Sequence, residues 1–451
     1  LRLVGSEMCI RDRHATNDAP SSKVTVQIYD RLVEQDDNMN IIPSLAESWE
    51  QPDDVTTVFH LRKGVKFHNG EPLTAADVKF SLDRMKNSPQ VSHIIGTVDK
   101  VEVVDENTVK VITKQPFGAL LSHLCHPTAA ILNEKAVKDA GDSYGQHPVG
   151  TGPYKYKDWK VGDRITLEAN DNYFGEKPSI KYVVIRAIPE ENSSVIGLET
   201  GEIDMTADLN AESRRLVMDN PELVYMEQSG ISVNYVGLNT DKGILKDKDV
   251  RRAIAMGIDR DAIIDSILLG SVQKANSFIA PGVFGYTPEA KTLEYNPEEA
   301  KKIIEEKGLT GSKLTIGVSN SPIRMQMSEI IQAQLKEIGL DVTVESLEWG
   351  AFLTATGRGD LDMFSLGWGP STYDGDYGYY PNFHSSQLGS AGNRSQYINP
   401  QMDKVLDEAK REIDVEKRKE LYKEVADIIY TDVPVIPMYY TNTVSYTHLR
   451  A

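Results

Sequence analysis

Cysteine is scarce in this chain. Only two cysteines occur among its 451 residues, Cys9 and Cys125, which excludes the disulfide framework that stabilises many small secreted domains. Low cysteine usage by itself leaves the cellular compartment open. A chain of this length is also too long for one hydrophobic core, so we expect two or three domains.

Long apolar runs and an excess of positive charge are missing as well. No apolar run approaches the roughly 20 residues that are needed to span a bilayer. Lys and Arg together number 49 and Asp and Glu number 67, which gives a formal net charge of −18. This acidic balance argues against nucleic acid or an anionic membrane surface as a partner.

Recognisable catalytic patterns are scarce in the sequence too. It contains no H-E-x-x-H motif and one G-x-S-x-G match, "GDSYG" (141–145), and its serines, histidines and aspartates form no nucleophile–base pattern. These absences favour a binding protein over an enzyme, and we predict no cofactor. A hydrolase stays open as an alternative, because catalytic triads assemble in space rather than in sequence.

Three short segments resemble ligand sites without completing one. "SHLCHP" brings His123, Cys125 and His126 together, but a fourth zinc ligand is missing, so we interpret it as structural or cleft-lining. "DGDYG" (374–378) resembles the start of a calcium loop but lacks the later acidic ligands. "VGTGPYK" (149–155) is neither a Walker nor a dinucleotide motif, and we predict a turn that re-enters a sheet.

The two ends of the chain differ in character from the rest. "LRLVGSEMCIRDR" at the start and "VSYTHLRA" at the finish resemble translated sequencing-adapter read-through. We therefore expect residues 1–13 and 445–451 to be non-native tails and exclude them from the fold. A natural tail is the alternative. Residues 1–13 also lack the apolar centre of a signal peptide, so we expect any signal to lie upstream of this fragment.

Residues 30–147 mix strand and helix patterns. "VTTVFHLRKG" (55–64) alternates apolar and polar residues as a strand does. In "EPLTAADVKFSLDRM" a helix is expected after Thr74, since Asp77 three residues on completes a capping box. "VEVVDENTVKVIT" is expected to form a hairpin. This part predicts a compact α+β unit.

The remainder alternates strands and helices. "KYVVIRAIP" (181–189) is a continuous apolar run, typical of a strand covered on both faces. Beyond residue 249 helices dominate, and "KLTIGVSN" (313–320), "RMQMSEIIQAQLKEIG" and "LDVTVESLEW" (340–349) predict a right-handed βαβ unit with a parallel sheet. Residues 400–430 are expected to be helical and 433–440 to be a strand. Ligands of such α/β sheets bind beyond strand ends or between lobes.

One segment fits neither a helix nor a strand period. "GWGPSTYDGDYGYYPNFHSS" (367–386) holds six aromatic rings, four glycines and two aspartates. Tyr and Trp supply rigid contact area, and glycine lets a ligand approach the backbone. We therefore predict a loop that recognises a ligand, with a plain tyrosine-rich surface loop as the alternative.

Several segments together resemble one family. "IIPSLAESWEQPDDVTTVFHLRKGVKFHNGEPLTAADVKFSLDRM" is similar to the signature region of family 5 extracellular solute-binding proteins, which serve ABC importers of peptides, glutathione, nickel and related solutes. "HPVGTGPYKYKDW", "LETGEIDM" and "PVIPMYY" follow in the family's order. The resemblance covers residues 16–444.

The resemblance implies an α/β, two-lobed periplasmic-binding-protein fold (class II) with an extra α+β domain inserted in the first lobe. Lobe I would comprise 14–42, 148–238 and 436–444, the inserted domain 43–147, and lobe II 239–435. It also implies a monomeric, non-catalytic receptor that traps a solute by hinge closure. Its partner would be an ABC permease, and its location periplasmic, or extracellular and membrane-anchored.

Within the family, the aromatic segment is most similar to peptide- and glutathione-type members. Peptide binders often have an aspartate about three residues after the Trp that binds the peptide ammonium, whereas this chain has Ser371. The usual ammonium contact is therefore not expected at this position, while the resemblance of the segment makes a short peptide or glutathione-like solute the main hypothesis. A nickel chelate, an opine or a sugar is the alternative solute, and a binding protein without a transporter is a further alternative.

The candidate ligand-binding residues follow from these segments. Trp368 and Tyr373 are expected to stack on the solute. One of Asp374 and Asp376 would meet a solute ammonium and the other would orient Arg394, whose planar fork suits a carboxylate. The alternative for each charge is a structural salt bridge within the loop.

Two further candidates lie earlier in the chain. Asn234 lies in "SGISVNYVG" (229–237), a strand whose backbone is expected to bind an extended ligand in β-fashion. Tyr29, in the predicted lobe I, is also a candidate ligand contact.

Overall fold

The computed structural model describes residues 2–5, 14, 19–36, 39–188, 191–207, 209, 211–389 and 392–448. The chain divides into two compact units. Unit 1 comprises Leu1–Gln228 and Thr443–Ala451, and unit 2 comprises Ser229–Asn442. No helix in the described ranges is long and apolar enough to cross a bilayer. The predicted boundaries of the two lobes and the inserted domain stay predictions.

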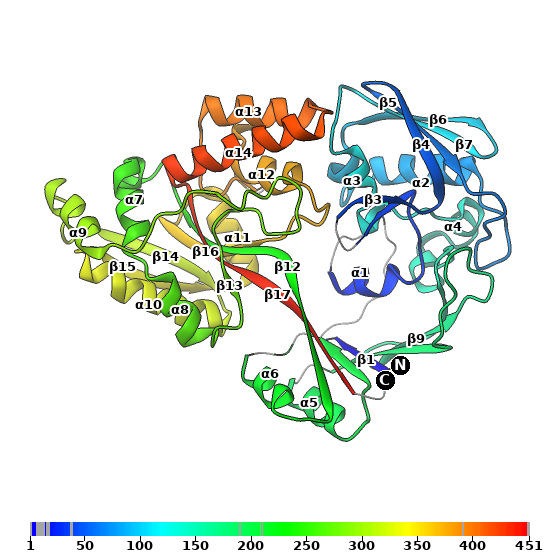
Figure 1. Ribbon diagram of the computed structural model, residues 1–451, viewed down its shortest axis with the longest axis horizontal. Coiled ribbons are helices and arrows are strands. Elements are labelled where there is room, and N and C mark those ends of the chain that lie inside the picture. Colours follow the sequence, from blue (N-terminus) through cyan, green and yellow to red (C-terminus); the bar gives the residue numbers. More distant parts are fainter. Residues whose placement is uncertain are drawn as a thin grey trace. The chain divides into compact units, whose positions relative to one another are not determined.

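Unit 1 is built mainly from strands (Figure 1). Its strands are β1 (Arg2–Gly5), β2 (Val33–Gln35), β3 (Ile41–Pro43), β4 (Ala46–Asp53), β5 (Thr56–Leu61), β6 (Val98–Asp105), β7 (Thr108–Thr113), β8 (Tyr154–Lys160), β9 (Arg164–Ala169), β10 (Tyr182–Ala187), β11 (Met205–Ala207) and the start of β12 (Leu223–Leu238). Its helices are α1 (Ala19–Thr25), α2 (Ala75–Lys86), α3 (Leu120–Leu124), α4 (Glu134–Ala140), α5 (Glu191–Glu199) and α6 (Ala211–Met218), with short 3₁₀ turns at Ser92–Ile95, Pro127–Ala129 and Gly141–Gln146.

One sheet of unit 1 is antiparallel, in the order β4-β5-β7-β6. Helix α2 packs on this sheet (Figure 1). The helix begins where the sequence predicts, because Thr74 and Asp77 form the expected capping box. The predicted hairpin is β6–β7 and the predicted strand at 55–64 is β5. These local predictions are confirmed.

A second sheet of unit 1 runs in the order β11-β1-β10-β9-β8. Strand β10 is not covered on both faces, so that prediction is wrong: Val183 and Ile185 are buried, whereas Val184 between them is only half-buried. The reason is that β10 pairs antiparallel with β9, and such sheets often bury one face. The turn predicted at 149–155 is confirmed, since it leads into β8.

The glycines of that turn allow a close approach of two chain segments. A Cβ at Gly150 would lie 2.0 Å from the carbonyl oxygen of Ile28, and one at Gly152 would lie 2.6 Å from its carbonyl carbon. The turn packs directly on the backbone after α1, and Gly152 N donates to Ile28 O at 2.8 Å. These two glycines are therefore explained by packing.

The two ends expected to be non-native lie partly outside the described residues. The backbone of β1 pairs in parallel with β10 and β11. The backbone at 445–447 pairs antiparallel with β11. Residues 6–13 and 449–451 are outside the description, so the non-native origin of these tails stays a prediction.

Unit 2 is an α/β structure. Its strands are the main part of β12, β13 (Gln273–Lys274), β14 (Lys313–Ser319), β15 (Asp341–Leu347), β16 (Met363–Trp368) and most of β17 (Val435–His448). Its helices are α7 (Lys248–Met256), α8 (Arg260–Ile267), α9 (Pro297–Glu306), α10 (Pro322–Glu337), α11 (Trp349–Arg358), α12 (Gly375–Phe383), α13 (Pro400–Arg411) and α14 (Val415–Asp432), with 3₁₀ turns at Gly243–Lys246 and Ser385–Gln387.

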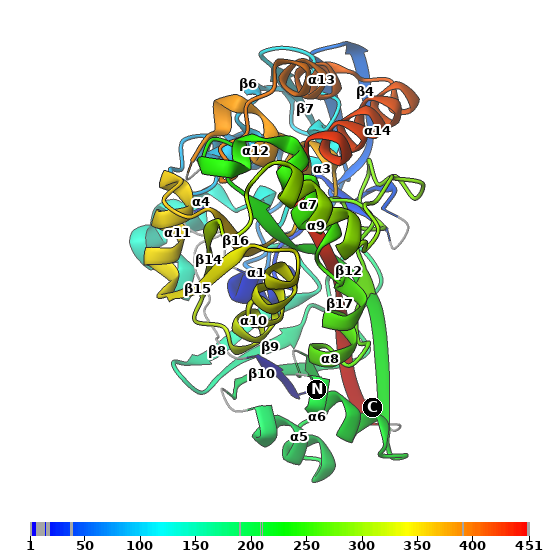
Figure 2. The ribbon, with the colours of Figure 1, turned by 90° about the vertical axis from the view of Figure 1, so that its left-hand side faces the viewer.

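The sheet of unit 2 runs in the order β15-β14-β16-β12-β17. The predicted βαβ unit is confirmed: β14 and β15 are parallel and α10 connects them (Figure 2). Strand β14 is also parallel to β16, whereas β12 and β16 are antiparallel. The helices predicted after residue 249 are α7 to α10, and α9 starts at the expected Asn296 cap.

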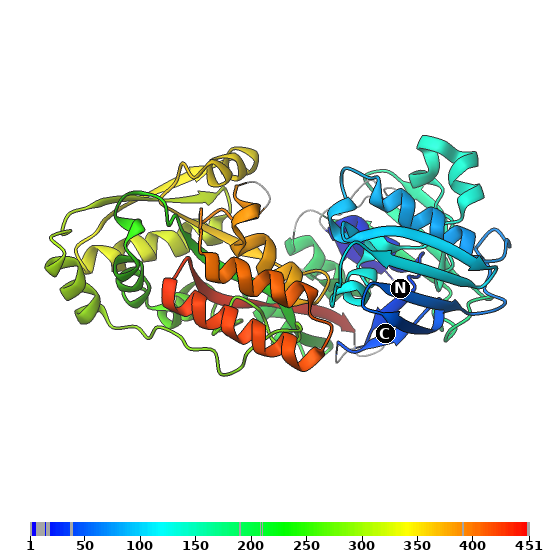
Figure 3. The ribbon, with the colours of Figure 1, turned by 90° about the horizontal axis from the view of Figure 1, so that it is seen from above.

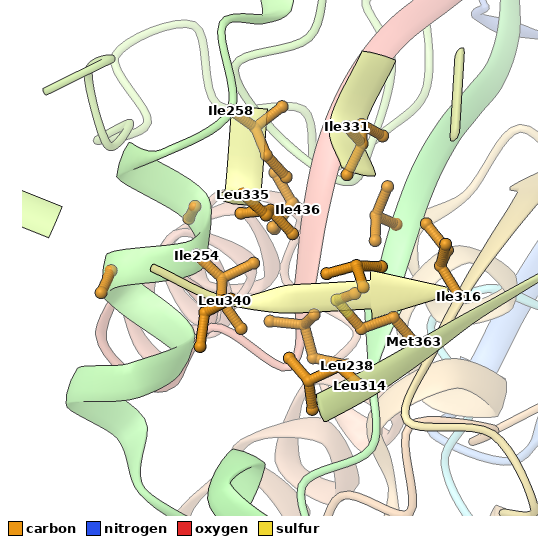
Figure 4. Packing of buried hydrophobic residues seen from close by; sticks show 14 of the residues in the cluster. Leu238, Ile254, Ile258, Leu314, Ile316, Ile331, Leu335, Leu340, Met363 and Ile436 are labelled. Carbon is orange, nitrogen blue, oxygen red and sulfur yellow. The ribbon is translucent and has the colours of Figure 1, made fainter. Parts of the chain in front are cut away.

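Successive residues of the central strands feed two cores, because side chains alternate between the faces of a sheet. On one face, side chains from the sheet meet those of α7 and α10 (Figure 4). The residues labelled there are Leu238, Ile254, Ile258, Leu314, Ile316, Ile331, Leu335, Leu340, Met363 and Ile436. On the other face, α11 to α14 form a second core with Tyr235 and Phe364. Helices α13 and α14 lie side by side there (Figure 3).

Candidate functional site

An open hollow of about 450 Å³ lies on unit 2, where β16 ends beside β12 and the start of α10. We call it the Trp368 hollow. It is lined by Ser232, Asn234, Ser321, Ile323, Arg324, Gly367, Trp368, Gly369, Tyr439 and Thr441. These residues come from β12, α10 and its cap, β16 and the turn after it, and β17, so four separate segments build one wall.

Trp368 is held in place at the last residue of β16. Its indole Nε1 donates to the carbonyl oxygen of Tyr377 at 3.0 Å, and the two ring centroids are 5.7 Å apart. The glycines on either side leave bare backbone. A Cβ at Gly369 would lie 2.5 Å from Ser232 Oγ, and one at Gly367 would lie 3.2 Å from Asn234 Oδ1. The half-buried indole ring of Trp368 is therefore flanked by two residues without side chains, Gly367 and Gly369.

The side chains of Asn234 and Arg324 meet beside Gly367. Asn234 pairs with Gly367 in the sheet, and Arg324 is the third residue of α10. Arg324 Nη2 donates to Asn234 Oδ1 at 3.5 Å, which is a long bond. Burial lowers the pKa of Arg324, and the nearby phenols of Tyr439 and Tyr235 partly offset that effect.

Strand β12 has a free edge in only one short stretch of its unit 2 part. From Val233 to Leu238 it pairs with β16 on one side, and β17 is its neighbour on the other. Most of that edge is therefore occupied from Val233 onward, and β-type binding of an extended ligand by the strand in 229–237 stays a prediction. β16 ends opposite Val233, so residues 230–232 extend past it on that side.

Asp374 does not face the Trp368 hollow. It is 1% exposed, and its Oδ1 accepts from Arg418 Nη2 at 2.7 Å and from Tyr422 OH at 3.3 Å. Burial acts to lower the pKa of Arg418, but Asp374 and Tyr422 together outweigh burial and raise it. The arginine that Asp374 meets is Arg418, and the predicted pairing of one of the two aspartates with Arg394 stays a prediction. Asp374 forms a structural salt bridge to α14.

The segment predicted to be a loop contains a helix, so that prediction is wrong. Asp374 caps α12, because its Oδ1 also accepts from Asp376 N at 2.9 Å. Tyr379 and Phe383 of α12 are fully buried in the second core of unit 2. Most of the rings therefore stabilise unit 2, and Trp368 is the one at the hollow.

The other predicted contacts in this region lie outside the set that lines the hollow. Ser371 and Tyr373 are half-buried in the turn before α12, where Tyr373 has φ of +56°. Asp376 is 5% exposed within α12. Arg394 Nη1 donates to Leu353 O at 2.7 Å and to Thr356 Oγ1 at 2.8 Å, so it binds the end of α11.

Tyr29 belongs to unit 1. It is 3% exposed in a core cluster there. Its hydroxyl donates to Tyr144 OH at 3.2 Å, and Tyr144 OH donates to Val149 O at 2.9 Å. These contacts connect Tyr29 to the turn at 149–155.

Comparison with known proteins agrees with this architecture. Residues 40–390 match the family described as bacterial extracellular solute-binding proteins, family 5 Middle. The chain belongs to this family. The dipeptide-binding protein of Escherichia coli (strain K12) is 29% identical over 445 residues, which cover 91% of this chain and 83% of that protein. Glutathione-binding protein GsiB of Salmonella choleraesuis (strain SC-B67) is 30% identical over 455 residues, which cover 98% and 89%.

A solved structure extends the comparison to the fold. The ABC transporter-associated periplasmic binding protein DppA from Helicobacter pylori, in complex with peptide STSA, superimposes with a TM-score of 0.83. It is 30% identical, and the match covers 99% of this chain and 93% of that chain. The predicted class of fold is thereby confirmed. This family 5 member is a solute-binding protein, and its family acts outside the cytoplasm.

Sequence reasoning found Trp368 and Asn234 but missed the other polar groups of the hollow in this family 5 chain. Arg324 is the most important of them. Its segment was interpreted only as a helix with one apolar face. A signal was present, since a cation in the first turn of a helix opposes the helix dipole and the first turn of α10 holds no acidic residue.

The remaining motifs have structural contacts. His123 Nδ1 bonds to Ile94 O at 2.5 Å and His126 Nδ1 to Thr128 Oγ1 at 2.7 Å. Burial raises the pKa of the Cys125 thiol to about 12. Within the described ranges, no group of three or more His, Cys, Asp or Glu is placed to hold a metal.

A second, narrower pocket of about 50 Å³ lies elsewhere on unit 2, beside Arg260. The Arg260 guanidinium donates to the carbonyl oxygens of Ala275 at 2.8 Å and Pro437 at 2.9 Å. Backbone groups thus satisfy this cation, and the pocket is too small for a peptide. The Trp368 hollow is the better ligand site.

Proposed function

We propose that this chain is the receptor of an ABC importer and captures a short peptide or a glutathione-like solute. The observation that carries the proposal is the Trp368 hollow, where a ring, an amide, a guanidinium and bare backbone converge. Relatives named for dipeptides and glutathione support that solute class. The solved complex of Helicobacter pylori DppA with peptide STSA supports it as well.

Trp368 and Asn234 make the direct contacts in this proposal. The solute packs against the indole ring, which the bond to Tyr377 holds in one orientation. A peptide backbone adds to β12 along residues 230–232, where β16 no longer occupies the edge. Affinity then comes from main-chain hydrogen bonds and from one aromatic contact.

In this proposal the other predicted residues hold the backbone around the Trp368 hollow in place and do not contact the solute. Asp374 and Asp376 form the start of α12, whose residue Tyr377 accepts the bond from Trp368. Arg394 binds α11 through Leu353 and Thr356. Ser371, Tyr373 and Tyr29 support the backbone around them.

We assign no catalytic step to this receptor. The residues that line the Trp368 hollow include serines but no His, Asp, Glu or Cys. A serine nucleophile needs an adjacent general base. A peptide incubated with the protein is therefore recovered intact, and mass spectrometry of the solute checks this.

The partner in this proposal is a membrane permease, and the receptor acts as a monomer outside the cytoplasmic membrane. A free periplasmic protein and a membrane-anchored one are separated by fractionating cells that express the full-length gene. Size-exclusion chromatography with light scattering checks the monomer.

Native mass spectrometry of the purified protein tests the solute class. We expect a co-purified or added tripeptide, or glutathione, to bind at one per chain. A thermal-shift panel with tripeptides, glutathione, nickel–histidine, an opine and a disaccharide gives a second readout. Binding of only the nickel complex, the opine or the sugar would overturn the proposed solute class.

A further inference from the structure

The pocket of about 50 Å³ beside Arg260 is lined by residues of unit 2. We call it the Arg260 pocket. Helices α7, α8 and α14, the start of β17 and the connection between β13 and α9 all contribute to its wall. Ten of its sixteen lining residues are alanine, valine, leucine, isoleucine, proline or phenylalanine. The wall is therefore mainly apolar, which is the usual character of a site for a small molecule.

Three alanines leave the space that forms the Arg260 pocket. Ala255 comes from α7, Ala426 from α14 and Ala290 from the connection between β13 and α9. Protein interiors are close-packed, and gaps larger than a water molecule are few in a domain. A water molecule needs roughly 10–15 Å³ of such space, so about 50 Å³ accommodates several non-hydrogen atoms. The pocket thus has the size of a small branched or cyclic molecule.

Polar side chains at the pocket wall already have partners within unit 2. The Arg260 guanidinium donates to backbone carbonyl oxygens. Asn276 Oδ1 accepts from Tyr440 OH at 2.9 Å, and Lys291 Nζ lies 2.9 Å from Asp427 Oδ1. A charged ligand would lose its hydration in the pocket without gaining these groups as partners. The wall therefore favours an uncharged, apolar ligand.

Val433 adds backbone strain to this wall. It is the C-cap residue of α14 and has φ of +48°, a conformation that β-branched residues rarely adopt. The carbonyl oxygen of Asp432, just before it, accepts from Arg251 Nε at 2.7 Å, which holds the backbone at this point. Strained residues are concentrated at ligand-binding and switch regions. A ligand packed against Val433 would add contacts where the backbone is strained.

We propose that the Arg260 pocket is a second binding site, which takes a small uncharged apolar molecule of about four to six non-hydrogen atoms. Affinity comes from the burial of apolar surface against the alanines and Val433. The inference goes beyond the proposed function and is independent of it, because the Arg260 pocket and the Trp368 hollow share no lining residue.

The test uses the full chain and probes of graded size and polarity. They are xenon, cyclopentane, the charged isobutyrate ion and the larger ring system indole. Xenon NMR and ligand-observed NMR in sealed tubes measure binding. Ala426→Leu and Ala290→Leu each place a larger side chain in the pocket, from two separate segments. Ala351→Leu, at an exposed position of α11 outside the pocket, is the matched control.

The wild type is expected to bind xenon and cyclopentane. Isobutyrate should bind at least about tenfold more weakly than cyclopentane, because its charge would be desolvated, and indole is too large to bind. Each filling variant should weaken cyclopentane binding by about tenfold or more, whereas Ala351→Leu should bind like the wild type. The comparison of probes on the wild type decides the proposal even where a filling variant does not fold.

Several outcomes would overturn the inference. It is wrong if the wild type binds neither xenon nor cyclopentane, or if both filling variants fold and bind cyclopentane as tightly as the wild type. Isobutyrate that binds as tightly as cyclopentane would contradict the uncharged class. A wild-type dimer that Ala426→Leu abolishes, detected by light scattering, would make a second copy of the chain the occupant. Peptide binding is measured separately, so its failure would sink the proposed function and leave this inference standing.

Discussion

Arg418 and Arg324 are two arginines of unit 2 in opposite surroundings. Arg418 is 4% exposed, donates to Asp374 Oδ1 at 2.7 Å and lies over the Phe284 ring at 4.6 Å. Arg324 is half-buried at the hollow, with one long bond of 3.5 Å. A guanidinium with a carboxylate and aromatic faces around it holds the fold together. One without a counter-ion is available to a ligand.

The same comparison applies to carboxylates. Asp374 in unit 2 has an arginine hydrogen-bonded to it, whereas the side-chain donors to Asp30 in unit 1 are hydroxyl groups: Thr151 Oγ1 at 2.7 Å and Tyr173 OH at 3.1 Å. Burial raises the pKa of Asp30 to about 6. The partner, more than the degree of burial, therefore decides whether a buried charge stabilises the protein at neutral pH.

The largest expected effect comes from breaking the paired site. Asp374→Asn removes the carboxylate that meets the buried charge of Arg418. Such changes cost about 3–5 kcal/mol of folding free energy. Urea unfolding followed by fluorescence in a Trp49→Phe/Trp159→Phe background measures the loss, because the two tryptophans that remain, Trp349 and Trp368, belong to unit 2.

The matched control is Glu416→Gln, which breaks the exposed ion pair to Lys419 on the same helix as Arg418. Exposed pairs contribute about 0–1 kcal/mol, so this variant should unfold like the wild type. If Asp374→Asn is equally harmless, the Arg418 pair is not a structural element. The Asp374 carboxylate would then again be a candidate for solute binding.

The second effect is a pH dependence in unit 1. The folded pKa of Asp30, about 6, lies above the ordinary value of about 3.9. Between these values the folded state binds more protons than the unfolded state. The Asp30 contribution to the unfolding free energy therefore falls as pH rises from about 4 to about 6, by up to about 3 kcal/mol.

His68 in the same unit has the opposite sign. Burial lowers its pKa to about 4, below the ordinary value of about 6.5. Its contribution is therefore lost as pH falls through that window. In Asp30→Asn, stability should fall more steeply on acidification than in the wild type, because the opposing contribution of Asp30 is gone. Urea unfolding from pH 4 to 7, followed by fluorescence in a Trp349→Phe/Trp368→Phe background that leaves Trp49 and Trp159 of unit 1, measures this, and parallel curves would contradict it.

Local capping and periodicity were enough to predict most elements. The capping box at Thr74, the Asn296 cap and the β14–α10–β15 unit involve neighbours in sequence, so their physics is visible there. Helix α12 was missed because its glycines, tyrosines and Pro381 show no helical period. Its start depends on the Asp374 cap and its stability on packing of Tyr379 and Phe383 into a distant core.

The site was only half predictable for a similar reason. Trp368 was found because it lies in a segment of unusual composition. Arg324 becomes significant only beside Asn234, which lies 90 residues earlier. The sequence also could not show that Asp374 meets Arg418, 44 residues later. The residue types indicated a ligand-binding segment. Contacts between residues far apart in the sequence decide which charged side chains pair with one another within the fold.

The third effect concerns solute affinity. Trp368→Ala removes the ring from the hollow and should weaken binding by about 1–3 kcal/mol, the range for losing a buried apolar contact. Isothermal titration with the tightest tripeptide or glutathione measures it. Trp349→Ala is the matched control, since Trp349 is 46% exposed and lies outside the hollow. Equal losses in the two variants would show that Trp368 has no special role.

The smallest expected effect is Gly367→Ala, which tests the free space beside the unpaired arginine. The new Cβ would lie 3.2 Å from Asn234 Oδ1 and 3.4 Å from Arg324 Nη2, so one of these groups must move by a few tenths of an ångström. We expect affinity for the tightest tripeptide or glutathione to fall by about two- to fivefold, or up to about 1 kcal/mol, while urea unfolding stays unchanged. Gly350→Ala, whose new Cβ would meet only the Glu348 carboxylate that caps α11, is the control outside the hollow and should leave affinity unaltered. If Gly367→Ala binds the solute as the wild type does, the guanidinium needs no room at this position. Arg324 would then resemble Arg418 in being part of the scaffold.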